Sequence, residues 1–228
     1  MTPAILYLID ILRWRGGTEI HLLELATRLE KNGFKPIVCN LGGDEPVLRD
    51  MAAAGVETWP RLMHRIYAPA GRKTIRQVIA EAGGWNIAAV QTFHFKSDWM
   101  GASVTRALGA PLISSRRDLG FSQTALRKLV YALVNRRVDA FIAPSDAVKR
   151  AVCEREGVPP ERVQVIYNGL DLTRFDTVHN RLEAREWLGV PPDNPLAGMV
   201  TRFRPNKDHP TLLKAWRQVV DPLPDPQL

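Results

Sequence analysis

The stretch Ala4-Ile-Leu-Tyr-Leu-Ile-Asp-Ile-Leu12, which runs on into Arg13-Trp-Arg-Gly-Gly-Thr-Glu19, decides the fold. Its first nine residues are almost entirely apolar and predict a buried β-strand. A helix is expected over residues 18–32, because Leu22, Leu25 and Leu29 recur at helical spacing along it. A buried strand, a glycine-containing turn and an amphipathic helix together form the opening of a βαβ unit.

The same alternation continues along the chain. Further strands are expected at residues 35–41, 56–59, 87–92, 111–115, 138–143 and 163–167. Helices are expected at residues 45–54, 72–82, 97–108, 123–135 and 145–156, with a long loop at 61–71. Strands separated by single helices indicate right-handed crossovers. The sequence therefore predicts an α/β fold with a doubly wound parallel, Rossmann-like sheet.

The composition changes near the turn at Asn168-Gly169, and Pro191, Pro192 and Pro195 stiffen a later connection. We expect an N-terminal domain at 1–170, a connection at 171–195 and the first βα unit of a second domain at 196–228. Its strand is expected at 196–203 and its helix at 208–220. One βα unit cannot form a sheet by itself, so an incomplete second Rossmann-like domain is predicted.

The 228 residues carry a net charge of +7 and no apolar run long enough to span a bilayer. Cys39 and Cys153 have no metal-ligand spacing and indicate a reducing cytoplasm. A solvated basic surface, phosphate-bearing ligands and an anionic membrane face are all compatible with the charge. Nucleic acid is a weaker alternative, because no nucleic-acid-binding motif accompanies the basic residues.

Chemistry-bearing residues follow several of the expected strands. Gly16 and Gly17 follow the first strand, His94 follows the strand at 87–92, and Arg116-Arg117-Asp118 follows the strand at 111–115. Carboxyl ends of parallel strands share one edge, where ligands bind in such sheets. Each group also has a structural explanation: a tight turn, a hydrogen-bonded histidine and a solvated salt-bridge patch. Their common edge favours a ligand site.

Arg202 and Lys207 flank a short connection before the last expected helix. Guanidinium and ammonium groups that converge on such a loop suit a diphosphate. The sequence contains no Cys/His metal cluster, no Gly-x-Ser-x-Gly motif and no Walker A loop. No metal is therefore expected, and the two cations are compatible with a phosphate-bearing ligand or with an ordinary basic loop.

Four segments stand in order along the chain. They are Gly16-Gly-Thr-Glu with the following helix, Asp139-Ala-Phe-Ile-Ala-Pro-Ser-Asp-Ala-Val, Val163-Gln-Val-Ile-Tyr-Asn-Gly-Leu-Asp-Leu-Thr-Arg-Phe and Val200-Thr-Arg-Phe-Arg-Pro-Asn-Lys-Asp-His. In this order they resemble the GT-B retaining glycosyltransferases of family 4. The third segment is the most specific of the set. Together they extend over nearly the whole chain.

The resemblance implies transfer of a sugar from a nucleotide-sugar donor to a sugar or lipid-linked acceptor, with retention of configuration. It implies no cofactor and no metal. Together with the cysteine content, it leads us to expect a cytoplasmic location with peripheral contact at the inner membrane face. The implied site residues are His94 and Arg117 for catalysis, Gly16, Gly17, Arg202 and Lys207 for the donor, and Glu19 and Asp118 for the acceptor.

The chain departs from the family pattern at several positions. Arg117 stands where many members have a histidine, and Thr201 and Asp208 replace glycines beside the donor cations. The family's Glu-x7-Glu segment would lie beyond Leu228, so we expect this polypeptide alone to lack turnover. A non-catalytic module that binds an acceptor or a partner is the alternative from another class. A nucleotide-sugar epimerase of the same architecture ranks lower, because its acidic and histidine constellation is absent.

Overall fold

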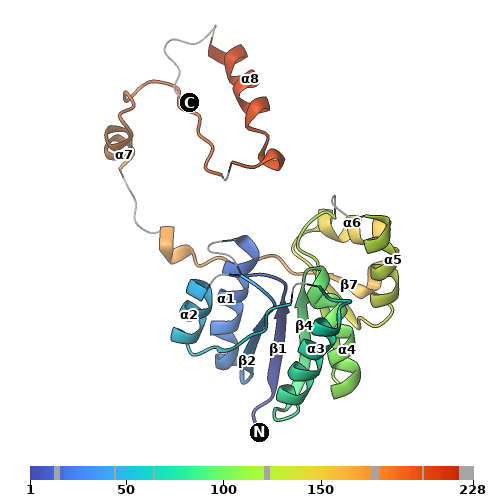
Figure 1. The fold of residues 1–228 in the computed structure, drawn as a ribbon. Helices are drawn as coiled ribbons and strands as arrows, with labels where there is room; N and C mark the ends of the chain where they lie inside the picture. Colours follow the sequence, from blue (N-terminus) through green and yellow to red (C-terminus); the bar gives the residue numbers. More distant parts are fainter. Residues whose placement is uncertain are drawn as a thin grey trace. The chain divides into compact units, whose positions relative to one another are not determined.

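The computed structural model describes residues 1–12, 16–43, 45–63, 65–120, 124–175, 180–201 and 203–220. The chain divides into two compact units, Met1–Gly169 and Leu170–Leu228, which we call unit 1 and unit 2. Figure 1 shows the sheet of unit 1 with helices on both of its faces.

Unit 1 is built on a seven-stranded parallel sheet with the order β3-β2-β1-β4-β5-β6-β7. The strands are β1 Ala4–Ile9, β2 Lys35–Asn40, β3 Glu57–Pro60, β4 Ile87–Phe93, β5 Leu112–Ser115, β6 Ala140–Ala143 and β7 Val163–Val165. The strand order reverses between β1 and β4. This reversal is the topological switch point of a doubly wound sheet, and it confirms the predicted fold class.

Helices connect the strands in the expected alternation. They are α1 Gly17–Leu29, α2 Glu45–Ala53, α3 Pro69–Ala82, α4 Phe95–Leu108, α5 Ala125–Val134 and α6 Asp146–Glu156. Short 3-10 turns lie at η1 Glu30–Asn32 and η2 Pro160–Arg162. No described helix combines the length and the apolar character needed to cross a bilayer.

Two apolar cores lie on opposite faces of the sheet, and β1 contributes to both. Leu6 and Leu8 pack into the core beneath α3, α4, α5 and α6, whereas Tyr7 and Ile9 pack into the core beneath α1 and α2. Side chains of a strand alternate between the two faces of its sheet. A strand that is apolar at every position is therefore buried on both faces, as the sequence of β1 predicted.

Local signals in the sequence set the helix ends. The Ser145 hydroxyl accepts a hydrogen bond from the Val148 amide at 3.3 Å and caps α6. Gly157 ends the same helix at φ 65°, a left-handed conformation that glycine adopts at low cost. The loop expected at 61–71 is shorter than predicted, because α3 already begins at Pro69, where the fixed φ of proline suits the first helical turn.

Unit 2 contains η3 Leu172–Phe175, α7 Arg181–Leu188, η4 Pro205–Lys207 and α8 His209–Val220. The helix expected at 208–220 is thus present, but the described residues of 196–203 form only an isolated bridge at Leu196 and no β-strand. An extended segment becomes a strand only when a neighbour accepts and donates its ladder hydrogen bonds. The Rossmann-like character of this unit therefore stays a prediction.

Large apolar side chains of unit 2 are exposed. The exposed fraction is 85% for Trp187, 106% for Val200 and 92% for Phe203, and α8 has no buried residue. In contrast, the charged side chain of Arg185 is buried, and its Nε donates a hydrogen bond to the Pro191 carbonyl at 2.9 Å. Local hydrogen bonding, rather than an apolar core, organises the described part of this unit.

Candidate functional site

The carboxyl ends of β1, β4 and β5 meet at the switch point of the sheet. Ile9 is in register with Phe93, and Phe93 is in register with Ser115. The residues that follow these strand ends are Asp10, His94 and Arg116. The pairing of parallel strands therefore brings Asp10 and His94, which are more than 80 positions apart in the sequence, to the same edge of the sheet.

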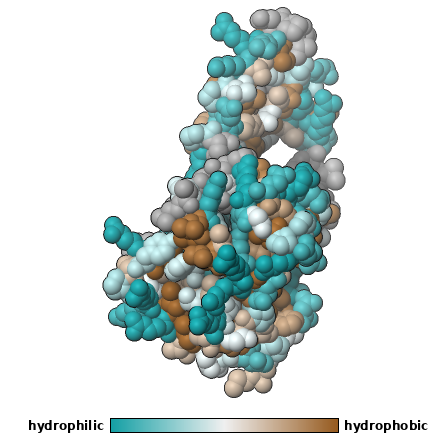
Figure 2. All heavy atoms as spheres, turned by 90° about the vertical axis from the view of Figure 1, so that its right-hand side faces the viewer, coloured by the Kyte–Doolittle hydropathy of each residue, from teal (hydrophilic) through white to brown (hydrophobic). Residues whose placement is uncertain are grey.

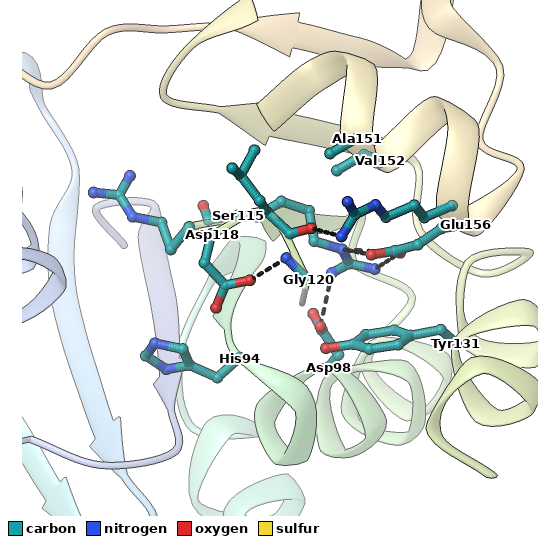
Figure 3. Close-up of a pocket in the computed structure, with 13 residues that line it drawn as sticks. His94, Asp98, Ser115, Asp118, Gly120, Tyr131, Ala151, Val152 and Glu156 are labelled. Carbon is teal, nitrogen blue, oxygen red and sulfur yellow. Dashed lines mark hydrogen bonds and ion pairs between the residues drawn. The ribbon is translucent and has the colours of Figure 1, made fainter. Parts of the chain in front are cut away.

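A cavity of about 40 Å³ opens at this edge, which is room for a few water molecules. Its lining comes from β5, α4, α5, α6 and the loop after β5 (Figure 3). The lining residues are His94, Asp98, Ser115, Arg116, Arg117, Asp118, Leu119, Gly120, Tyr131, Ala151, Val152, Arg155 and Glu156. Three predicted site residues, His94, Arg117 and Asp118, thus border one cavity.

His94 has an unusual backbone and an unsatisfied ring nitrogen. It precedes α4 with φ 81° and ψ 177°, a region that residues other than glycine rarely adopt. The Ser97 hydroxyl donates to the His94 carbonyl at 2.9 Å and holds this conformation. Nδ1 of His94 is buried and has no hydrogen-bond partner among the described atoms. A strained residue with an unsatisfied polar atom beside a cavity is typical of a functional position.

Asp10 fixes the helix that follows His94. Its carboxylate accepts hydrogen bonds from the backbone amides of Lys96 at 2.9 Å and Ser97 at 2.6 Å. These amides belong to the first turn of α4, where no carbonyl of the helix can accept from them. Asp10 therefore caps α4 across the switch point. The aspartate at the end of an otherwise apolar strand is the sequence signal for this role, and the sequence-based prediction missed it.

Arg116 is buried and forms ion pairs with two carboxylates. Its Nη1 donates to Oδ2 of Asp98 at 2.7 Å, and its Nη2 donates to Oε2 of Glu156 at 2.9 Å and to Oδ1 of Asn135 at 2.7 Å. The guanidinium also lies over the ring of Tyr131, 4.6 Å from its centroid. One side chain therefore joins the end of β5 to α4, α5 and α6.

Asp98 is the most deeply buried carboxylate of this cluster. Hydroxyl groups of Thr92 and Ser114 donate to its Oδ1 at 2.5 and 2.6 Å. Burial raises the pKa of Asp98, and the positive charge of Arg116 opposes that change. Burial by itself would lower the pKa of Arg116. The negative charges of Asp98 and Glu156 have a larger combined effect in the opposite direction, so the pKa of Arg116 is raised. The cluster keeps its arginine charged in an apolar setting.

The sequence interpretation treated Arg116-Arg117-Asp118 as one cluster, and the structure separates its members. Arg116 is buried, Arg117 is half-buried at the edge of the cavity, and Asp118 is exposed. Arg117 donates from Nη2 to Oδ1 of Asn168 at 2.9 Å. Asp118 accepts from the Gly120 amide at 2.7 Å, which shapes the loop. In Figure 3, His94 and Asp118 lie at the end of the cavity away from Glu156.

The beginning of α1 lies close to Arg117. Burial, followed by the positive charge of Arg117, lowers the pKa of His21 to about 4. Gly17 is one turn before His21 and has open space where a Cβ would be, whereas a Cβ at Gly16 would overlap the Glu19 carboxylate. The structure thus places Gly16 at the N-cap and Gly17 in the first turn of the helix that carries His21, whose pKa responds to Arg117.

The predicted donor cations belong to unit 2. Arg202 lies outside the described residues, and Lys207 is exposed at the end of η4. Asp208 follows with φ 50°, a conformation that aspartate tolerates better than most residues. The backbone at Asp208 therefore has a left-handed conformation, which a glycine, the residue expected there from the family pattern, would adopt easily. Among the described residues, no three of His, Cys, Asp or Glu gather to hold a metal ion.

A doubly wound sheet with a strained histidine and an arginine at its switch point defines a Rossmann-like ligand-binding domain. The model of the family described as Glycosyltransferase Family 4 matches residues 15–174, so the chain belongs to this family. The fold also matches solved GT-B glycosyltransferases. Against Anabaena HepE in complex with UDP and glucose, the TM-score is 0.76 at 22% identity, covering 94% of this chain and 57% of that one.

Other similar proteins agree with this assignment. D-inositol 3-phosphate glycosyltransferase 2 of Catenulispora acidiphila is 29% identical over 90% of this chain and 53% of its own length. An uncharacterized glycosyltransferase of Methanocaldococcus jannaschii is 22% identical over 90% of this chain and 56% of its own. The chain spans about half the length of these curated relatives.

The lowered pKa of His21 predicts how the free energy of unfolding depends on pH. Because its pKa is lowered from 6.5 to about 4, the unfolded chain binds the proton more tightly than the folded chain. The free energy of unfolding should therefore fall as the pH decreases from about 6.5 to about 4. Urea titrations of the wild type and His21→Gln at several pH values measure this, and the variant should show a smaller decline. Equal declines would contradict the assigned pKa.

Proposed function

We propose that this protein contributes to the transfer of a sugar from a nucleotide-sugar to an acceptor, with retention of anomeric configuration. One observation within the fold carries the proposal: His94, strained and with Nδ1 unsatisfied, borders the switch-point cavity together with Arg117. Family membership supplies the reaction class. A site that leaves a buried ring nitrogen without a partner is ready for a polar substrate group.

In this proposal His94 and Arg117 contact the reacting groups, and Gly16 and Gly17 let the donor approach the start of α1. Glu19 and Asp118 contact acceptor hydroxyls. The pKa of Arg117 is lowered by burial, which leaves its charge poorly hydrated and strengthens its attraction for an anion. A phosphate oxygen of the donor takes the proton from the attacking hydroxyl group of the acceptor. Nuclear magnetic resonance of the product shows whether the anomeric configuration of the sugar is retained.

Arg202 and Lys207 bind the donor diphosphate and stabilise the charge that grows on it as the glycosidic bond breaks. We propose that these two cations take the place of a metal, so transfer should be insensitive to a chelator. We also propose that residues 1–228 alone do not turn over. Without a complete donor domain they would be a module that binds the acceptor.

A donor screen with Lys207→Ala tests the proposal. UDP-glucose enters the donor panel because HepE was solved with UDP and glucose, and D-inositol 3-phosphate enters the acceptor panel because of the Catenulispora relative. Both panels are run on the polypeptide as the cell makes it and on residues 1–228 expressed alone. Wherever transfer is found, we expect Lys207→Ala to lower kcat by about 100-fold, the loss that follows removal of one charge-stabilising donor.

Lys214→Ala is the matched control, because Lys214 is an exposed lysine of α8 in the same unit. It should leave transfer unchanged. Activity that survives Lys207→Ala would contradict the diphosphate role. Transfer by residues 1–228 alone would contradict the proposed lack of turnover, and transfer by neither polypeptide with any donor would contradict the reaction class.

We further propose a cytoplasmic location. Cys39 and Cys153 are both free, which suits a reducing compartment. Burial raises the pKa of the Cys39 thiol to about 12, so this sulfur stays protonated and unreactive. Fluorescence of a tagged chain after cell fractionation tests the location.

A further inference from the structure

Asp10 lies beside His94 at the switch point, although the two residues are far apart in the sequence. Ile9 of β1 and Phe93 of β4 are register partners, and Asp10 and His94 are the residues that follow them. Asp10 does not line the switch-point cavity, whereas His94 does. Any influence of Asp10 on chemistry in that cavity therefore passes through another residue.

The carboxylate of Asp10 fixes the first turn of α4 through two consecutive amides. Its Oδ2 accepts from the Lys96 amide at 2.9 Å, and its Oδ1 accepts from the Ser97 amide at 2.6 Å. A charged acceptor forms stronger hydrogen bonds than a neutral one, and the dipole of a helix favours a negative charge at this end. The start of α4 is therefore tied to the end of β1 as well as to β4, the strand that precedes it.

Ser97 connects this cap to the peptide groups on both sides of His94. Its hydroxyl accepts from the Phe93 amide at 3.2 Å, and its oxygen lies within hydrogen-bond distance of the Phe93 and His94 carbonyls. Ser97 is fully buried and is no part of the mixed hydrophilic and hydrophobic surface that Figure 2 shows for this side of unit 1. The position of Ser97, which Asp10 holds, thus sets the orientation of both peptide groups that flank the His94 Cα.

The backbone of His94 needs such support. Its φ of 81° and ψ of 177° belong to a region that is essentially restricted to glycine and persists only where the surrounding structure over-determines it. We propose that Asp10 is a positioning residue for sugar transfer, which holds the His94 backbone in this conformation and so keeps the imidazole at the cavity. The inference rests on the role proposed above for His94. Asp10 itself contacts neither donor nor acceptor.

Kinetics of Asp10→Ala and Asp10→Asn in the polypeptide as the cell makes it test the proposal. Alanine removes both hydrogen bonds, whereas asparagine keeps one acceptor oxygen. We expect kcat to fall by about 100-fold in Asp10→Ala, the loss that a small misplacement of a reacting group causes, and by less in Asp10→Asn. The KM for the donor should stay unchanged, because Asp10 contacts no substrate.

A double-mutant cycle shows whether Asp10 acts through His94. In a His94→Ala background, Asp10→Ala should cause no further loss of kcat, because the side chain that Asp10 positions is already absent. Losses of kcat that add in the double variant would overturn the proposal. Circular dichroism checks the fold of each variant, and Asp10→Asn gives the same comparison if Asp10→Ala does not fold.

Ser145→Ala is the matched control. It removes the cap of α6, a hydrogen bond accepted from the Val148 amide, and leaves the backbone around His94 untouched. It should destabilise a helix in the same way without lowering kcat. Equal losses of kcat in Ser145→Ala and Asp10→Ala would show a general effect of helix capping and would overturn the proposal.

A measurement that needs no transfer separates this proposal from the proposed function. Nuclear magnetic resonance of residues 1–228 gives the one-bond coupling between Cα and Hα of His94, which depends on the sign of φ. We expect the coupling of a positive φ in the wild type and in Ser145→Ala, and a changed coupling in Asp10→Ala. An unchanged coupling in Asp10→Ala would overturn the positioning role, whether or not any donor supports transfer. A changed coupling without any transfer would contradict the reaction class while supporting the hold of Asp10 on His94.

Discussion

Replacing Arg116 with methionine is expected to lower the free energy of unfolding by about 3–5 kcal/mol, which is the cost of breaking a buried ion pair from one side. Methionine has a similar length but no charge, so Asp98 and Glu156 would stay buried without their cation. Asp98 is 1% exposed and Arg116 is 6% exposed, so both charges lie largely out of contact with bulk water. Urea denaturation at neutral pH measures the effect.

Arg117→Met is the matched control, because it makes the same substitution at the next position. Arg117 is half-buried and bonds only to Asn168 among the described partners, so we expect a change of within about 1 kcal/mol. A second variant removes all three charges, with Asp98→Asn and Glu156→Gln added to Arg116→Met. It should regain part of the lost stability, because no buried charge is left uncompensated. Equal effects at Arg116 and Arg117 would contradict the buried ion cluster.

Gly101→Val is the second substitution with a large expected effect. A Cβ at Gly101 would lie 2.6 Å from Cγ2 of Thr92 and 2.9 Å from Cδ1 of Leu112, closer than carbon atoms pack. Valine would push α4 away from β4 and β5, at a cost of about 1–3 kcal/mol or more. The same shift would disturb the hydrogen bond from Thr92 to Asp98. Thermal and urea unfolding should both show the loss.

Gly83→Val is its control. Gly83 ends α3 with φ −62°, and a Cβ there would meet no atom closer than 3.4 Å. The backbone therefore accepts an L-residue, and we expect a change of no more than about 0.5 kcal/mol. If Gly101→Val were as well tolerated as Gly83→Val, the close packing of α4 on the sheet would be wrong.

The sequence predicted the elements of unit 1 well, because its strands are apolar on both faces and its helices carry their own end signals. The strand expected at 196–203 shows the limit of that reasoning. Residues 196–200 are apolar enough for a strand, yet a strand also needs hydrogen-bonding neighbours along its length, and the described residues of unit 2 form a single bridge at Leu196 and no strand. The residue pattern of a segment indicates which side chains it could bury, but it does not indicate whether a neighbouring strand is present to pair with it.

For the site, spacing predicted that His94 and Arg117 would lie at one edge, but their chemistry depends on the tertiary structure. Consecutive residues that leave a strand point to different surroundings, which is why Arg116 is buried in an ion cluster while Arg117 faces the cavity. Asp98 and Glu156 come from helices far apart in the sequence, and no local pattern joins them to Arg116.

The sequence by itself determined the order of strands and helices, the parallel sheet and the family, because these follow from apolar periodicity and from short motifs. Only the tertiary structure decided which charges are buried and how the His94 backbone is held. Those properties arise where strand ends and helices from distant positions meet. Burial and hydrogen bonding, which set the energy of a charge, depend on three-dimensional neighbours rather than on neighbours along the chain.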